Sequence, residues 1–103
     1  MEHHFDQELS AFKERLLTMA SHAETAVNQA LQALVNRDLE LALRVKDDDR
    51  VLDQFEIEID DLAIHLLAKA PLASDLRLVT VAMKISQNLE HVGDEAAKIA
   101  KRP

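Results

Sequence analysis

Residues that break helices are nearly absent from this sequence, and this constrains the fold more than any other feature. The 103 residues include one glycine and two prolines. Polar or proline-containing interruptions are concentrated at 36–38 and 70–75, and the rest is rich in alanine, leucine, glutamate, lysine, arginine and glutamine. These residues favour helix, whereas a fold of many strands needs a turn about every 8–12 residues. The sequence therefore predicts three helices separated by two short joints.

The two joints set the boundaries of the predicted helices, which are expected over about 5–35, 39–69 and 74–101. Asp38 suits the N-cap of the second helix, Pro71 ends that helix, and Ser74 suits the N-cap of the third. Helices of this length are about 45 Å long, and joints of a few residues make neighbouring helices antiparallel. We therefore expect one domain, 1–103, that is all-α: an up-down-up antiparallel three-helix bundle.

Apolar residues three and four positions apart predict which face of each helix lies in the core. The first stripe is Phe5, Leu9, Phe12, Leu16, Met19, Ala20, Ala23, Val27, Ala30, Leu31 and Leu34. The second is Ala42, Val45, Leu52, Phe55, Ile59, Leu62 and Leu66. The third is Leu78, Ala82, Ile85, Leu89, Val92, Ala96 and Ile99. Ile85 is near the middle of the third stripe, so we expect it to be buried.

The third helix carries a second apolar side made of Leu76, Val79 and Met83. A helix that is apolar on two sides is normally buried on two sides. The extra neighbour is either a second copy of the chain, giving a homodimer through this helix, or a further bundle of a longer protein. The alternative is that these side chains cover the end of the bundle near Pro71.

Charge and composition exclude several classes of protein. With 12 Lys+Arg and 19 Asp+Glu, the formal net charge is −7, which argues against a nucleic-acid partner. The absence of cysteine excludes disulfides, thiolate metal sites and a cysteine nucleophile. No apolar run approaches 18 residues and no secretory signal opens the chain, so we expect no membrane insertion and a cytoplasmic location.

Carboxylates are concentrated in the second predicted helix, where residues 47–61 hold eight of them. Asp49, Asp53, Glu56 and Asp60 are spaced 4, 3 and 4 residues apart and form a ladder along one flank. Like charges at this spacing destabilise a helix unless solvent, salt or a cation screens them. The ladder is therefore either a solvated acidic face or part of a site for a hard or borderline cation such as magnesium, calcium, manganese, iron or zinc.

The third predicted helix repeats the acidic spacing with Glu90 and Asp94. Gly93 beside them predicts open surface where an ion could approach. Antiparallel packing places this pair at the height of Asp49 and Asp53, although the helical wheel turns Glu90 and Asp94 away from the expected core stripe. The two pairs are therefore predicted either to share a site or to need a second chain to complete it.

Motifs for catalysis are missing. The Glu-x-x-His pattern of di-iron bundles does not occur, because Asn88 precedes His91 by three residues and Leu62 precedes His65. Both histidines are predicted to be ordinary surface residues. No zinc-protease motif, glycine-rich phosphate loop or nucleophile elbow is present, so we expect a protein that is not an enzyme.

Several stretches resemble the PhoU family of regulators associated with phosphate uptake. They are 4–9, 17–27, 38–49, 56–60, 71–78 and 88–94. The segment PLASDLRL at 71–78 is the most specific, and NLEHVGD at 88–94 resembles the family's Glu-x-x-x-Asp signature. The resemblance covers nearly the whole chain and implies one three-helix repeat, whereas family members usually carry two. Departures are Ala70 before Pro71, where the family usually has glutamine, and Lys98, where related sequences often have asparagine.

The resemblance implies a function and a metal site. The chain would be a non-enzymatic negative regulator of phosphate uptake and phosphate-starvation signalling, an adaptor between phosphate ABC transporter components and a sensor histidine kinase. Surface metal clusters, of divalent or iron-type ions, would be held by Asp49, Asp53, Glu90 and Asp94. The metal, its number and direct phosphate binding stay open. The rival hypothesis is a metal-binding or metal-sensing bundle without a transporter partner, and a carboxylate metallohydrolase is a more distant third.

Overall fold

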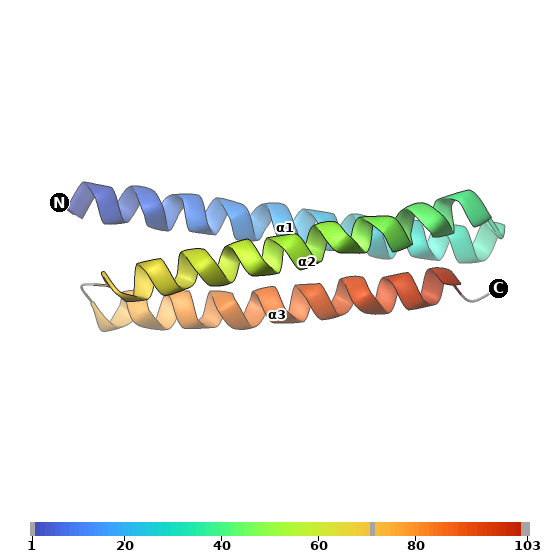
Figure 1. Ribbon diagram of the computed structural model, residues 1–103. Coiled ribbons are helices and arrows are strands. Elements are labelled where there is room, and N and C mark those ends of the chain that lie inside the picture. The colour runs from blue at the N-terminus through green and yellow to red at the C-terminus, as the bar shows by residue number, and fades with distance from the viewer. Residues whose placement is uncertain (1, 71, 102–103) are drawn as a thin grey trace.

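Three helices run the length of the molecule in the computed structural model, which describes residues 2–70 and 72–101 (Figure 1). They are α1 (Glu2–Asn36), α2 (Leu39–Leu67) and α3 (Ala73–Lys101). The chain runs up, down and up, and the bundle measures 53 × 18 × 16 Å. The described residues contain no strand, so the predicted all-α three-helix bundle is confirmed. Across those residues, none of the helices has the length and apolarity required to cross a membrane.

The joint between α1 and α2 is short because both helix ends are capped. Arg37 adopts a left-handed φ of 53°, and the Asp38 amide donates to the Ala33 carbonyl at 3.0 Å. This is the hydrogen bond that closes a helix C-terminus around a left-handed residue. The Asp38 side chain then accepts from the Leu41 amide at 3.1 Å, so the predicted N-cap of α2 is confirmed.

The joint between α2 and α3 differs from the expectation at both ends. α2 ends at Leu67, with Ala68 as its C-cap, two residues before the expected Lys69. Ser74 is not the N-cap of α3. The amides of Asp75 and Leu76 donate to the Leu72 carbonyl at 3.1 and 3.2 Å, so Ser74 lies inside the first turn. The predicted stop at Pro71 lies outside the described residues.

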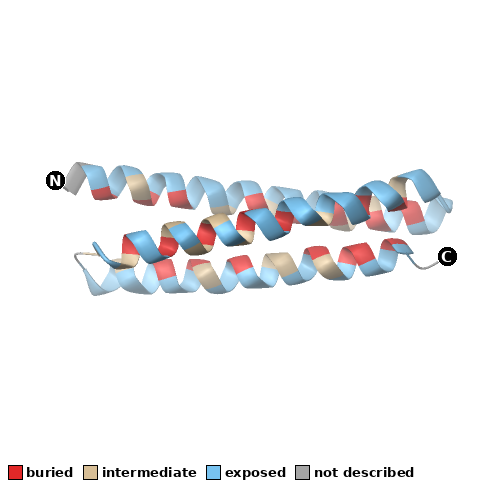
Figure 2. Ribbon diagram, viewed as in Figure 1, coloured by how far each residue is buried: buried red, intermediate tan, exposed pale blue. Residues whose placement is uncertain are grey.

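The core of α1 and α2 follows the predicted stripes (Figure 2). α2 buries six of the seven predicted residues, and the seventh, Leu62, is half-buried beside the buried Ala63. The large core side chains of these two helices with almost no exposure are Phe12, Met19, Val45, Leu52, Ile59 and Leu66. Near the end of α1 the predicted Ala30 is buried, but Leu31 and Leu34 are exposed, and Ala26 and Ala33 are buried in their place. The half of the bundle near the first joint is therefore packed mainly through alanine.

The prediction for α3 was wrong at four of its seven positions. Ala82 and Ala96 are buried and Leu89 is half-buried, whereas Leu78, Ile85, Val92 and Ile99 are exposed. Ile85 is 42% exposed, whereas Val79 is completely buried. The buried positions are Val79, Ala82, Ser86, Gly93, Ala96, Ala97 and Ala100, and Leu89 is half-buried. Apart from Ala97, these residues recur at alternating spacings of 3 and 4, the pattern of a coiled-coil seam. Most of these side chains are small. A sequence-based prediction that favours the largest aliphatic side chains therefore selects the neighbouring stripe as the core.

The expected dimer patch is also wrong, for the same reason. Val79 belongs to the core, Met83 is half-buried against it, and only Leu76 of the three is exposed. Leu76, Val79 and Met83 therefore do not form a free second face. The exposed aliphatic side of α3 includes Leu78, Ile85, Val92 and Ile99, which are four of the seven residues that were expected to be inside.

Candidate metal-binding surface between α2 and α3

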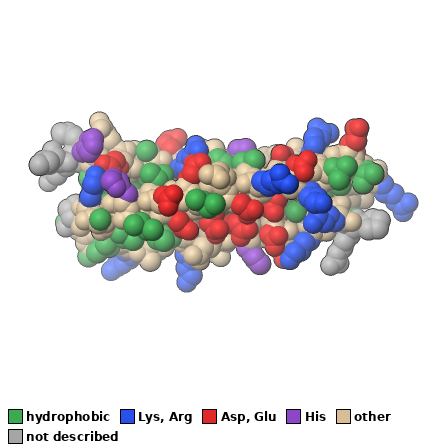
Figure 3. All heavy atoms as spheres, viewed as in Figure 1, with side chains coloured by type: hydrophobic (Ala, Val, Ile, Leu, Met, Phe, Trp, Pro, Cys, Tyr) green, Lys and Arg blue, Asp and Glu red, His purple; other side chains and the backbone are tan. Residues whose placement is uncertain are grey.

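Acidic side chains gather on one side of the bundle about halfway along its length (Figure 3). The α2 part is the predicted ladder of Asp49, Asp53, Glu56 and Asp60, which lies beside the buried stripe of the same helix. The ladder is on the side of α2 that faces α3, since residues of both helices interact across it. We call this group, together with Glu90 and Asp94, the acidic cluster.

α3 places Glu90 beside Asp53 of the ladder, and it places Asp94 near enough to Asp49 for their charges to interact, within one chain. The Glu90 side chain hydrogen-bonds with Asp53 and also feels the charges of Glu56 and Asp49, while Asp49 also feels the charge of Asp94. α3 is rotated about its axis so that Gly93 faces the core. This rotation turns Glu90 and Asp94 toward α2. The four predicted site residues therefore influence one another electrostatically across α2 and α3, and Glu56, which the sequence pattern signalled only as a ladder position, also acts on Glu90. They do not form a group whose possible ligand atoms all lie within 4.8 Å of one another among the residues that the structure describes.

Removal from water and mutual repulsion perturb the protonation of the acidic cluster. Desolvation, followed by the hydrogen bond with Asp53 and by neighbouring charges, raises the pKa of Glu90 to about 7. Desolvation also raises the pKa of Asp49, with Asp53 and Asp94 adding to it. Desolvation followed by Asp60 and Asp53 raises the pKa of Glu56. Near neutral pH, Glu90 is therefore partly protonated.

Two carboxylate oxygens of the ladder have no hydrogen-bond partner within the part of the chain that the structure describes. They are Oδ1 of Asp49 and Oδ1 of Asp60, both removed from solvent. An unsatisfied buried acceptor costs about 1–3 kcal/mol. A cation beside Asp49 would supply the missing partner there, and carboxylate oxygens suit a hard metal ion. Asp60 is about 16 Å further along α2, so the same ion cannot reach it.

Gly93 controls how closely α3 approaches this surface. A Cβ atom on residue 93 would lie 2.2 Å from Leu52 Cδ1 and 3.1 Å from Asp49 Oδ1. The expectation of open surface over Gly93 is therefore wrong, because Leu52 fills that space and Gly93 is buried. The glycine instead allows α2 and α3 to pack tightly beneath the acidic cluster.

Basic residues border the cluster on α3. Lys98 Nζ lies 3.4 Å from Asp94 Oδ2 and 3.4 Å from Glu95 Oε1, and Lys101 partly offsets the rise in the pKa of Asp49. His91, Asp94 and Glu95 also have possible ligand atoms within 4.8 Å of one another. Lys98 already pairs with both carboxylates of that trio, so it competes with any ion there.

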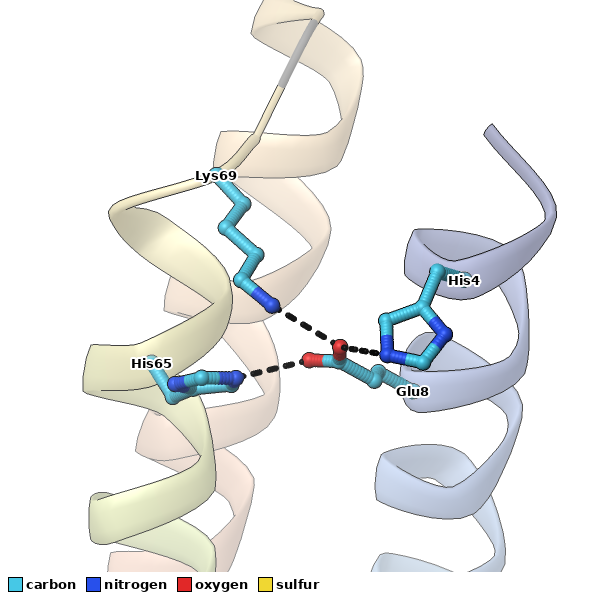
Figure 4. A network of polar contacts seen from close by, with 4 residues as sticks. All are labelled: His4, Glu8, His65 and Lys69. Carbon is cyan, nitrogen blue, oxygen red and sulfur yellow. Dashed lines mark hydrogen bonds and ion pairs between the residues drawn. The ribbon is translucent and has the colours of Figure 1, made fainter. Parts of the chain in front are cut away.

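A separate polar network joins α1 to the end of α2 (Figure 4). Glu8 accepts from Lys69 Nζ at 2.9 Å and lies 3.6 Å from His4 Nε2. His65 Nε2 is 2.9 Å from Glu8 Oε2, at an ion-pair distance but without hydrogen-bond alignment. The pKa of Glu8 is lowered from its usual value, mainly because of the hydrogen bond from Lys69. The contacts are near the surface, so we assign them a role in closing the bundle rather than in chemistry.

The protonation of Glu90 predicts how stability depends on pH. The folded chain binds more protons than the unfolded chain between the ordinary Glu90 pKa of 4.5 and about 7, so stability should fall as the pH rises through this window. We expect a loss of about 1–2 kcal/mol between pH 5 and 8 after allowing for solvent screening. Urea denaturation at the two pH values measures it.

Glu90→Gln should remove most of this dependence and make the chain more stable at pH 8, since the amide keeps a donor for Asp53 without adding charge. Asp48→Asn, an exposed change on α2, is the matched control and should preserve the wild-type slope. Equal slopes for wild type and Glu90→Gln would contradict the assignment of the perturbed carboxyl.

Comparison with known proteins gives matches over nearly the whole chain. The family model described as the PhoU domain matches residues 16–102. The chain is 43% identical over 99 residues to a phosphate-specific transport system accessory protein PhoU homolog of Rhizobium meliloti, covering 95% of this chain and 42% of that protein. It is 38% identical over 98 residues to the accessory protein PhoU of Escherichia coli K12, covering 94% of this chain and 41% of that protein. The chain thus spans about two fifths of the length of these relatives.

Proposed function

The chain belongs to the PhoU family, and on this premise we propose that it is a non-enzymatic regulatory accessory of phosphate transport. The observation that carries the proposal is the family match over residues 16–102, together with relatives that are named as accessory proteins of phosphate-specific transport. Those relatives are more than twice as long as this chain. The activity of the full-length relatives is therefore assigned to this chain only as a proposal.

The proposed action is that of an adaptor in the cytoplasm. The chain would connect components of a phosphate ABC transporter with a sensor histidine kinase and hold the starvation response off when phosphate is abundant. A rigid bundle 53 Å long, with an acidic face on α2 and α3 and an apolar face elsewhere, offers separate surfaces for different partners. That geometry supports an adaptor better than a catalyst.

The acidic cluster is proposed to bind metal ions through Asp49, Asp53, Glu90 and Asp94. Support comes from the unpartnered Asp49 oxygen and from the raised pKa of Glu90, whose proton a cation would displace. Such a cation would supply positive charge on a chain whose net charge of −7 otherwise repels phosphate. Magnesium, calcium, manganese and iron suit carboxylate ligands.

A genetic experiment tests the regulatory proposal. The chain is expressed in its source cell lacking the native copy, and a phosphate-starvation promoter is measured in phosphate-rich medium. We expect repression of that promoter by the wild-type chain, and capture of a transporter subunit or the sensor kinase by the purified chain. Phe12→Ala, which removes a core side chain, serves as the poorly folded control. An unrepressed promoter together with no capture of either partner would contradict the proposal.

The rival hypothesis, a metal-sensing bundle without a transporter partner, is favoured by one observation, the convergence of two acidic pairs in a single chain. This hypothesis also includes the metal site, but it predicts that the chain has no effect on the starvation promoter. A promoter that responds to the wild-type chain and to phosphate supply would exclude it. A chain that binds metal tightly and leaves the promoter unchanged would favour it.

Metal binding itself is tested by thermal melting. Each ion is added to the chelator-treated chain, and the melting temperature is recorded. A tenfold excess over the dissociation constant should stabilise the fold by about 1.4 kcal/mol. The double variant Asp49→Asn with Asp94→Asn should abolish the rise and leave the metal-free chain as stable or slightly more stable, because repulsion is relieved.

The control for that experiment is Asp47→Asn with Asp48→Asn, which removes two exposed carboxylates from the same helix outside the cluster. It should keep the wild-type rise. If manganese, iron, zinc, magnesium and calcium all leave the wild-type melting temperature unchanged, the cluster is a solvated acidic face.

A further inference from the structure

Two arginines border a shallow groove between α1 and α2, on the opposite side of α2 from the acidic cluster. The groove is lined by Arg15, Arg50, Val51, Gln54, Phe55 and Glu58. Its volume of about 320 Å³ is near the lower end of the usual range for sites that bind small ligands. We call this feature the arginine groove.

Arg15 of α1 is held in place by contacts on two sides. Its guanidinium carbon lies 4.8 Å from the centroid of the Phe55 ring, in a cation–π contact. Arg15 Nε donates to Glu58 Oε2 at 2.6 Å, and one terminal nitrogen of the guanidinium pairs with the same oxygen. These bonds use two of the five N–H donors of the guanidinium. Three donors are therefore available to a ligand on a side chain that is already fixed in position.

Arg50 of α2 has no carboxylate partner, although many carboxylates are near it in the sequence. It is the only basic residue in the segment 47–61, which holds eight carboxylates. Within the part of the chain that the structure describes, Arg50 forms no ion pair. It is exposed and borders the arginine groove. All of its donors and its full charge are therefore directed to solvent or to a ligand.

Gln54 lies between the two arginines. Arg50, Gln54 and Glu58 are spaced four residues apart, so they form one strip along α2. Arg50 and Glu58 are about 12 Å apart along the helix axis, and Gln54 is midway between them. Because Arg15 joins this strip at Glu58, an ion above Gln54 would have one arginine on each side.

The charge of the arginine groove has the opposite sign to that of the chain. Arg15, Arg50 and Glu58 sum to +1, compared with −7 for the whole chain. At short range the local charge outweighs the net charge, because salt screens exposed charges beyond about 8 Å. The planar fork of a guanidinium matches the oxygens of a phosphate group and can donate two hydrogen bonds to it.

We propose that the arginine groove binds a small tetrahedral oxyanion, and that inorganic phosphate is its ligand. Arg15 and Arg50 donate to the ion from its two sides and the Gln54 amide donates from between them, whereas Glu58 competes with the ion for Arg15. Binding here needs no metal ion, so the site is distinct from the acidic cluster. It does not depend on the proposed regulatory function, because it follows from the arginines and the groove alone.

A phosphate titration of the purified, chelator-treated chain at pH 7 tests the site. Two-dimensional NMR follows the Nε–H signals of the two arginines and the side-chain amide of Gln54, and we expect saturable shifts in all three. The chelator removes metal ions that would otherwise bring phosphate to the acidic cluster. The double variant Asp49→Asn with Asp94→Asn should therefore keep the wild-type dissociation constant for phosphate.

Variants of the groove should change that constant in opposite directions. Arg50→Gln should raise the phosphate dissociation constant at least tenfold, because it removes charge-assisted hydrogen bonds. Glu58→Gln should lower it at least threefold, because it removes a negative charge and releases Arg15. Arg77→Gln is the matched control, since Arg77 is exposed on α3 outside the groove, and it should keep the wild-type constant. Circular dichroism checks that each variant stays helical.

The same oxyanion chemistry is present in a phosphorylated protein, so a phosphoserine peptide is the second probe. We expect it to bind no more tightly than inorganic phosphate, because the groove is small. Tighter binding of the peptide would show that the free ion is the wrong ligand.

Two other results would overturn the proposal. The first is the absence of a saturable shift in the arginine signals of the wild-type chain. The second is equal weakening by Arg50→Gln and Arg77→Gln, which would reveal a general effect of net charge.

Discussion

Replacing Phe12 by alanine is expected to lower the free energy of unfolding by about 3–5 kcal/mol, the usual range for truncating a buried aromatic side chain. Phe12 of α1 has no exposed surface and lies in the core cluster that includes Phe55 and Ile59 of α2 and Val79 of α3. Its loss leaves a cavity where all three helices meet. The helices cannot move together to fill this cavity, because their other core side chains hold them apart.

Urea denaturation followed by circular dichroism measures this loss at a fixed, low chain concentration. Ile64→Ala is the matched control, because Ile64 is 64% exposed on α2. Its effect should stay within about 0.5 kcal/mol. A cost below about 1 kcal/mol for Phe12→Ala would show that the three-helix core is assigned wrongly.

Replacing Gly93 by alanine is expected to destabilise the fold by about 1–3 kcal/mol, although alanine is the better helix former. In an open helix the change would gain about 1 kcal/mol. Here the new methyl group would lie 2.2 Å from Leu52 Cδ1, and Leu52 is itself almost completely buried. Forcing an extra methyl group into a filled core costs more free energy of folding than the higher helix propensity of alanine contributes.

A double-mutant cycle isolates this contact. Leu52→Ala removes the side chain that the new methyl group would strike, so Gly93→Ala in that background should be neutral or stabilising. The same unfavourable effect in both backgrounds would mean that Gly93 serves some purpose other than close packing against α2. Because Asp49 also lies near residue 93, the single variant should weaken metal binding as well.

The elements could be predicted because their signals are local. The polar interruption at Asp38 produced the expected cap, and the α2 stripe from Ala42 to Leu66 was read almost correctly. The second joint was read less well. Backbone hydrogen bonds to Leu72, rather than the Ser74 hydroxyl, begin α3, and no side-chain pattern indicates that choice.

The sequence predicted which residues form the acidic cluster, but it did not predict how they are arranged. The spacing of Asp49 and Asp53, and of Glu90 and Asp94, is visible in the sequence and reveals two pairs at one height. Whether the pairs meet depends on how α3 is rotated about its axis, and the helical wheel gave the wrong rotation. The raised pKa of Glu90 follows from that rotation, because it places Glu90 against Asp53.

Local chemistry determined that this chain forms three long helices, where their joints lie, and which faces of α1 and α2 are largely buried. Only the packing of the helices decided the orientation of α3. Gly93, Ser86 and three alanines on its inner seam let the backbones approach closely, so the tightest packing buries small side chains. Ile85 and its neighbours are consequently left outside, although they are more hydrophobic. Hydrophobicity acts through each side chain separately, whereas close packing is a property of the three helices together.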